Sequence, residues 1–114
     1  MKLAWTKAAI RDLVHIRRSI AHDNPTAASA VASRILDAVD KVPRHPEMGR
    51  IGRLVGTREL VVTGTPYLIP YRVHPKAIEL LRVLHGRQNW PRGGERADQG
   101  IRPTRKKSRA ADTY

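Results

Sequence analysis

Residues 58–91 constrain the fold more than any other part of the chain. They read RELVVTGTPYLIPYRVHPKAIELLRVLHGRQNWP, in which runs of β-branched, aromatic and leucine residues are separated by short turns. The runs predict three strands, over residues 58–62, 67–73 and 78–84. Connections this short make neighbouring strands antiparallel. Because Pro70 has no backbone N–H, we expect a bulge or an unpaired stretch in the middle strand.

Two amphipathic helices are expected before these strands. A short strand candidate covers residues 2–5, and Thr6 then offers a hydroxyl as N-cap for the first helix. Asn24 and Pro25 begin the second helix, since Asn caps well and Pro suits the first helical position, and Pro43 ends it. Apolar residues recur at helical spacing in both segments: Ala9, Leu13, Ile16 and Ile20, then Ala28, Val31, Ile35, Ala38 or Val39, and Val42. We therefore expect an α+β fold, with an antiparallel helical hairpin packed on a small antiparallel sheet.

The chain length of 114 residues allows one domain and no second lobe. Residues 43–57 form a loop by composition, with two prolines and three glycines among few apolar side chains. Residues 92–114 contain one large aliphatic residue, Ile101, and cannot bury enough surface to offset the entropy of ordering them. We expect a domain over residues 1–91 and a disordered basic tail over residues 92–114.

Charge and cysteine content narrow the classes of function. The chain carries 22 basic and 10 acidic residues, a net charge of +12, which favours a polyanion or an acidic protein as partner. The absence of cysteine excludes disulfides, thiolate metal sites and cysteine nucleophiles. No apolar run approaches the roughly 20 residues that span a bilayer, so we expect a cytoplasmic protein without membrane association.

Basic side chains concentrate in the predicted sheet. We expect five of them to lie close together: Arg58, Arg72, Arg82, His85 and Arg87. The arginines fit a cluster for phosphate or carboxylate, or ordinary solvated positions on an open sheet face. His85 fits a general acid or base, or a hydrogen-bonding residue at a strand end. Trp90 fits a contact aromatic or, as the scarcity of large aromatics favours, a plug that closes the sheet against the helices.

Other kinds of site find little support. The remaining histidines lack ligand spacing, so we expect no metal site and no cofactor. No serine has His and Asp neighbours, and no Gly-rich phosphate loop precedes a helix. The charge alone would fit a nucleic-acid-binding module, but the chain has no recognition-helix or stacking-aromatic signature.

Four short sequence motifs occur in order along the chain, in and beside the predicted strands: Gly49-Arg50, RELVV at 58–62, GTPYLIPYRV at 64–73 and LRVLHGRQNW at 81–90. Together with the element order they resemble the RelE/ParE family of bacterial toxins over residues 1–91. The resemblance implies the toxin of a type II toxin-antitoxin module, of the kind linked to growth inhibition and plasmid stabilisation. It also implies a hetero-oligomer with a cognate antitoxin, which alone would contact operator DNA.

The family divides by target, and the resemblance extends to this division. Members similar to RelE cut messenger RNA in the ribosome with a basic cluster that includes an arginine just after the residue matching Tyr67. Leu68 holds that place here, and the Asn-Trp-Pro ending is similar to the ParE branch, which binds DNA gyrase.

We therefore favour a non-catalytic gyrase inhibitor with no catalytic residue assigned. The residues expected to contact the antitoxin or the target are Arg58, Arg72, Arg82, Arg87 and Trp90. The alternative is a ribosome-dependent messenger RNA endonuclease that works through Arg82, His85 and Arg87.

Overall fold

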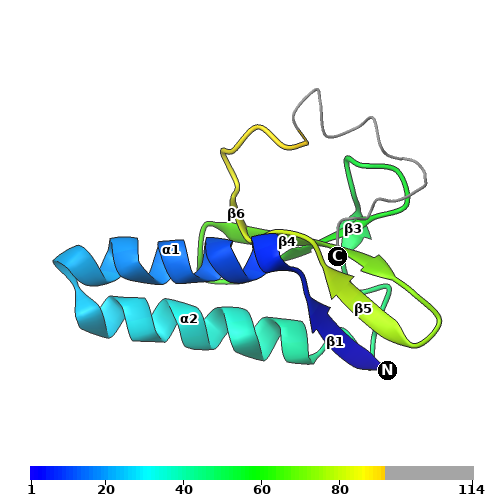
Figure 1. The fold of residues 1–114 in the computed structure, drawn as a ribbon, viewed down its shortest axis with the longest axis horizontal. Helices are drawn as coiled ribbons and strands as arrows, with labels where there is room; N and C mark the ends of the chain where they lie inside the picture. Colours follow the sequence, from blue (N-terminus) through cyan, green and yellow to red (C-terminus); the bar gives the residue numbers. More distant parts are fainter. Residues whose placement is uncertain (92–114) are drawn as a thin grey trace.

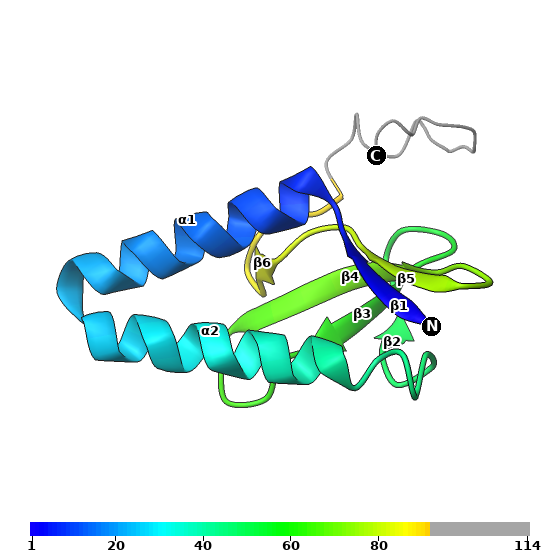
Figure 2. The same cartoon turned by 60° about the horizontal axis from the view of Figure 1, so that its bottom comes forward.

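The computed structural model describes residues 1–91, which form two helices and one six-stranded sheet. The elements are, in chain order, β1 (Lys2–Trp5), α1 (Lys7–Asp23), α2 (Pro25–Asp40), β2 (Arg50–Ile51), β3 (Arg58–Val61), β4 (Tyr67–Val73), β5 (Ala77–Leu80) and β6 (Leu84–His85). The strand order is β1-β5-β4-β3-β2, with β6 beside β4 (Figures 1 and 2). The expected α+β fold is confirmed, whereas the predicted tail over residues 92–114 lies outside the described residues.

Two polar caps define the helical hairpin. The Thr6 hydroxyl oxygen accepts the N–H of Ala9 at 3.1 Å, and its own proton goes to the carbonyl of Leu80 at 2.8 Å. Asn24 accepts the N–H of Ala27 through Oδ1 at 3.1 Å, while its backbone N–H donates to Ile20 at 2.8 Å. Both predicted N-caps are confirmed, and one asparagine ends α1 and begins α2. The helices run antiparallel side by side (Figures 1 and 2), and neither is long and apolar enough to cross a membrane.

The main core lies between the hairpin and one face of the sheet. The expected helix stripes supply fully buried Ala9, Ile35 and Val39, and partly buried Leu13 and Ile16 pack against them. The strands, with Val62 just after β3, contribute most of the other buried side chains of this core: Leu60, Val62, Ile69, Tyr71, Ile78 and Leu80. Strand residues two apart share a face, so this set defines the helix-covered face of the sheet and leaves an opposite, distal face.

The sheet is mixed rather than purely antiparallel. Strands β3, β4 and β5 are antiparallel neighbours, as their short connections predict. β1, however, pairs with β5 in parallel, with Leu3 beside Ile78. The helical hairpin and three strands separate β1 from β5 in the chain, and this length permits the parallel pairing.

The third predicted strand, over residues 78–84, is interrupted opposite Pro70. β5 ends with Leu80 paired to Tyr71, and β6 begins with Leu84 paired to Leu68, so three residues face two. The Pro70 carbonyl accepts the N–H of Leu81 at 2.9 Å, but Pro70 has no N–H to return. The expected unpaired stretch at Pro70 is thus confirmed on this edge of β4, whereas the bulge lies in the neighbouring segment and not in the middle strand. The prediction of one continuous strand over residues 78–84 was therefore wrong. The bulge also determines the direction of the Arg82 side chain.

Candidate functional site

The expected cluster of five basic side chains does not form, because strand alternation separates Arg58 from Arg72. Arg58 pairs with Tyr71 across β3 and β4, so it shares the helix-covered face, and Arg72 must point to the distal face. The Arg58 guanidinium donates to the carbonyls of Gly49 at 2.8 Å and Glu47 at 3.3 Å. On the distal face Arg72 stands opposite Glu79, a buried carboxylate whose Oε1 lies 2.8 Å from Nε2 of His74.

Arg82 is tied to the first helix. Its Nε and Nη2 donate to Asp12 at 2.6 and 3.1 Å, the bidentate geometry that is common between a guanidinium and a carboxylate. The same carboxylate accepts the backbone N–H of Val83 at 2.9 Å, within the bulge. Asp12 therefore provides the acceptor for a backbone N–H in the irregular segment after β5 and balances the charge of Arg82. Sequence reasoning missed this contact because 70 residues separate the two partners.

His85 and Arg87 lie together at the end of β6. The His85 ring meets Tyr67 edge to face, with centroids 5.8 Å apart, and Nδ1 accepts the backbone N–H of Arg87 at 3.1 Å. Gln88 closes the turn by accepting the His85 N–H at 2.8 Å. These contacts fit a hydrogen-bonding histidine at a strand end. The side chain of Arg87 is exposed.

Trp90 is buried, but on the face opposite to the expected one. It is 6% exposed and packs with Leu68 and Leu84, and partly buried Leu54 and Leu81 complete the group. Leu68 alternates with Tyr67 and Ile69, which face the helices, so this distal cluster lies on the distal face. The prediction of a plug was right about burial and wrong about location, because the helices and strands already fill the main core.

A buried ion-pair group holds the β2–β3 loop over the distal face. Glu59, which is 1% exposed, accepts Arg50 at 3.2 Å and both the backbone N–H and Nε of Arg53 at 3.0 Å. Burial raises the pKa of Glu59, but the hydrogen bonds and charge of Arg53, together with the hydrogen bond from Arg50, outweigh it and leave that pKa lowered. Leu54 follows in this loop and joins the distal cluster. A lone acidic residue within an apolar strand was the available sequence signal.

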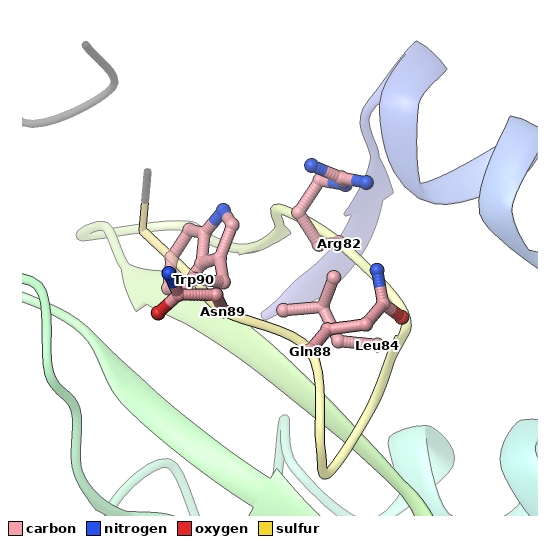
Figure 3. Close-up of a pocket in the computed structure, with 5 residues that line it drawn as sticks. All are labelled: Arg82, Leu84, Gln88, Asn89 and Trp90. Atoms are coloured by element: carbon pink, nitrogen blue, oxygen red, sulfur yellow. The ribbon is translucent and has the colours of Figure 1, made fainter. Parts of the chain in front are cut away.

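A shallow hollow of ≈ 260 Å³ opens beside the distal cluster. Figure 3 shows its lining, which comes from the bulge, β6 and the segment after β6: Arg82, Leu84, Gln88, Asn89 and Trp90. Leu84 and Trp90 supply apolar surface, while the other three bring donors at the rim. Two of the predicted contact residues, Arg82 and Trp90, therefore meet here; Arg58 and Arg72 do not join them. Within residues 1–91, no group of three or more His, Asp or Glu side chains could hold a metal ion.

Comparison with known proteins agrees with this architecture. The family model described as ParE toxin of type II toxin-antitoxin system, parDE, matches residues 3–90. Protein Y4kP of Sinorhizobium fredii is 44% identical over 90 residues, which cover 79% of this chain and 93% of Y4kP. Toxin RelE2 of Caulobacter vibrioides is 37% identical over 84 residues, which cover 74% of this chain and 93% of RelE2.

A solved structure has the same fold. It is described as the chromosomal ParDE TA system from P. aeruginosa, and its matching chain superposes with a TM-score of 0.69 at 28% identity. The match covers 75% of this chain and 95% of that one. With the family model spanning nearly all of the described residues, the chain belongs to the ParE toxin family of type II toxin-antitoxin systems.

Proposed function

We propose that this toxin acts by binding DNA gyrase, without catalysis, and that its antitoxin neutralises it by covering the toxin surface. The observation that carries the proposal is the burial of Leu68 beneath Trp90. Leu68 occupies the place where the ribonuclease branch of the family keeps an arginine. In this chain Leu68 belongs to the apolar distal cluster. The position therefore provides hydrophobic packing and no hydrogen-bond donor for the transition state of RNA cleavage.

The charges around this cluster support the same proposal. Arg82 is paired with Asp12, Arg50 and Arg53 are paired with Glu59, and Arg72 stands opposite buried Glu79. Catalysis of RNA cleavage requires preorganised donors that face the developing charge on the phosphate. Guanidinium groups already paired with carboxylates are poorly suited to this task. A protein target needs only surface shape and a few polar contacts, which the fold provides.

A messenger RNA endonuclease is the second candidate. His85 and Arg87 lie side by side at the exposed end of β6, where a histidine could transfer a proton and an arginine could bind a phosphate. Two relatives at 37% and 33% identity carry the name RelE. The first candidate is preferred because the remaining arginine of that proposed trio, Arg82, is committed to Asp12.

Induction in cells separates the two candidates. A cytoplasmic gyrase inhibitor should cause filamentation and a DNA-damage response while bulk translation continues at first. Primer extension on cellular messages should reveal no new cuts, and His85→Ala should reduce toxicity little. Codon-phased cuts that vanish in His85→Ala would overturn the gyrase proposal and favour the endonuclease.

A further inference from the structure

The indole of Trp90 carries a hydrogen-bond donor without a partner in the described residues. The residue is 6% exposed, yet its Nε1–H makes no hydrogen bond within residues 1–91. Figure 3 shows the indole nitrogen at the edge of the ring on the side of Arg82, where the hollow lies. Folded proteins pair nearly all donors that become buried, so a donor at the wall of a hollow needs an acceptor from whatever molecule fills that hollow.

The rest of the hollow is also rich in donors. Asn89 and Gln88 bring carboxamides to the rim, and because Gln88 Oε1 already accepts the His85 N–H, its NH₂ group is turned to other partners. Arg82 lines the same space while its charge is balanced by Asp12. The site therefore favours an oxygen acceptor with an apolar stem, since Leu84 and the indole ring form the apolar part of the lining.

The size and burial of the hollow decide which kind of molecule fits. At ≈ 260 Å³ it lies just below the ~300–1,000 Å³ of typical small-molecule sites, which suits one inserted side chain. Single-stranded nucleic acid is usually held by aromatic faces on which bases stack, but Trp90 is 6% exposed and packs with Leu68 and Leu84, which leaves little ring surface for stacking. Residues 1–91 carry 15 basic and 7 acidic residues, a net of +8, which favours an acidic partner; since base stacking is disfavoured, an acidic protein fits better than nucleic acid.

We propose that this hollow is an anchor site for the antitoxin, and that it accepts one antitoxin side chain ending in a carboxylate or a carboxamide oxygen. The oxygen accepts the Nε1–H of Trp90, and the methylene groups of that side chain contact Leu84. This inference rests on the proposed neutralisation by an antitoxin and adds the chemistry of one contact. Toxin and antitoxin would bury the indole donor together, so its hydrogen bond to a protein acceptor would form only in the complex.

The first experiment follows the indole proton directly. The chain has two tryptophans, Trp5 and Trp90, so a ¹⁵N-labelled toxin gives two indole signals, assigned with Trp90→Phe. Trp5 packs against the main core and serves as the internal control. On titration with the purified product of the adjacent antitoxin gene, we expect the Trp90 signal to shift downfield and its hydrogen exchange to slow. An unmoved Trp90 signal in a saturated complex would overturn the proposal.

Affinity measurements give an independent result. Trp90→Phe keeps an aromatic ring but removes the donor, and should weaken antitoxin binding about five- to tenfold, as expected for one lost hydrogen bond. Trp5→Phe, its matched control, should bind as the wild type does. If both variants fold by circular dichroism and bind equally well, the anchor site is wrong while the toxin-antitoxin pairing stands. If the wild-type toxin forms no complex, the proposed neutralisation itself fails.

One further variant identifies the acceptor. Asn89→Asp places a negative charge at the rim, and should weaken binding of a carboxylate tenfold or more through like-charge repulsion, while a neutral carboxamide should bind within about threefold of the wild type. Asn89→Ala, without the charge, controls for the lost carboxamide. If Asn89→Asp bound more tightly than Asn89→Ala, the occupant would be cationic and the proposal would be overturned. A single-stranded RNA 12-mer should leave the Trp90 indole signal in place, and a shift with RNA alone would contradict a protein anchor.

Discussion

Removing the carboxylate of Asp12 should destabilise the domain more than the loss of a partly exposed side chain usually does. Asp12→Ala leaves the N–H of Val83 without its acceptor, and Val83 is 2% exposed. An unsatisfied buried donor costs about 1–3 kcal/mol. The loss of the two-pronged contact to Arg82 adds about 1 kcal/mol, since the side chains are 28% and 19% exposed and solvent screens the pair. We expect a total loss of about 2–4 kcal/mol.

Urea unfolding of four proteins tests this reasoning: the wild type, Asp12→Ala, Arg82→Ala and the double variant. Arg82→Ala should cost less than Asp12→Ala, about 1–2 kcal/mol, because Val83 keeps its acceptor. The double variant should then be more stable than the sum of the single effects predicts, with a coupling of about 1 kcal/mol. Additive effects, or an Asp12→Ala loss below about 0.5 kcal/mol, would refute the conclusion that the ion pair between Asp12 and Arg82 stabilises the bulge.

Two further stability predictions follow from buried polar groups. Tyr71→Phe removes a hydroxyl that donates to Pro46 at 2.7 Å and accepts from Gly49 at 2.9 Å, so urea unfolding should show a loss of about 2–3 kcal/mol, against little change for Tyr67→Phe. Because the folded-state pKa of Glu59 is lowered, its contribution is complete at neutral pH and is lost as pH falls from the ordinary 4.5 through the folded value. Glu59→Gln should therefore flatten the acid limb of the stability curve; an unchanged limb would contradict this.

Local rules predicted the helical half of the fold well. The caps at Thr6 and Asn24 depend on side chains that reach only three residues along the chain, and the apolar stripes depend on helical period alone. Such signals are contained in short stretches of sequence. The three antiparallel strands and the irregularity at Pro70 were predicted for the same reason, because turn length and a missing N–H are local properties.

The site was harder to predict because it depends on faces and distant partners. Alternation sends Arg58 and Arg72 to opposite faces, and this could have been read from the strand pattern once Tyr71 was placed in the core. The ion pair between Asp12 and Arg82 joins residues 70 positions apart, and no local sequence pattern indicates it. The position of Trp90 depends on the bulge, whose extra residue changes the course of everything after Leu80.

The most direct test of the central claim combines purified toxin with purified DNA gyrase in a supercoiling assay. We expect inhibition at near-stoichiometric toxin, reversal on addition of the antitoxin, and no message cleavage when the same preparation is added to translating ribosomes. Replacement of Trp90 by Ala should reduce the inhibition more than His85→Ala does. Unimpaired supercoiling together with message cleavage on ribosomes would contradict the account.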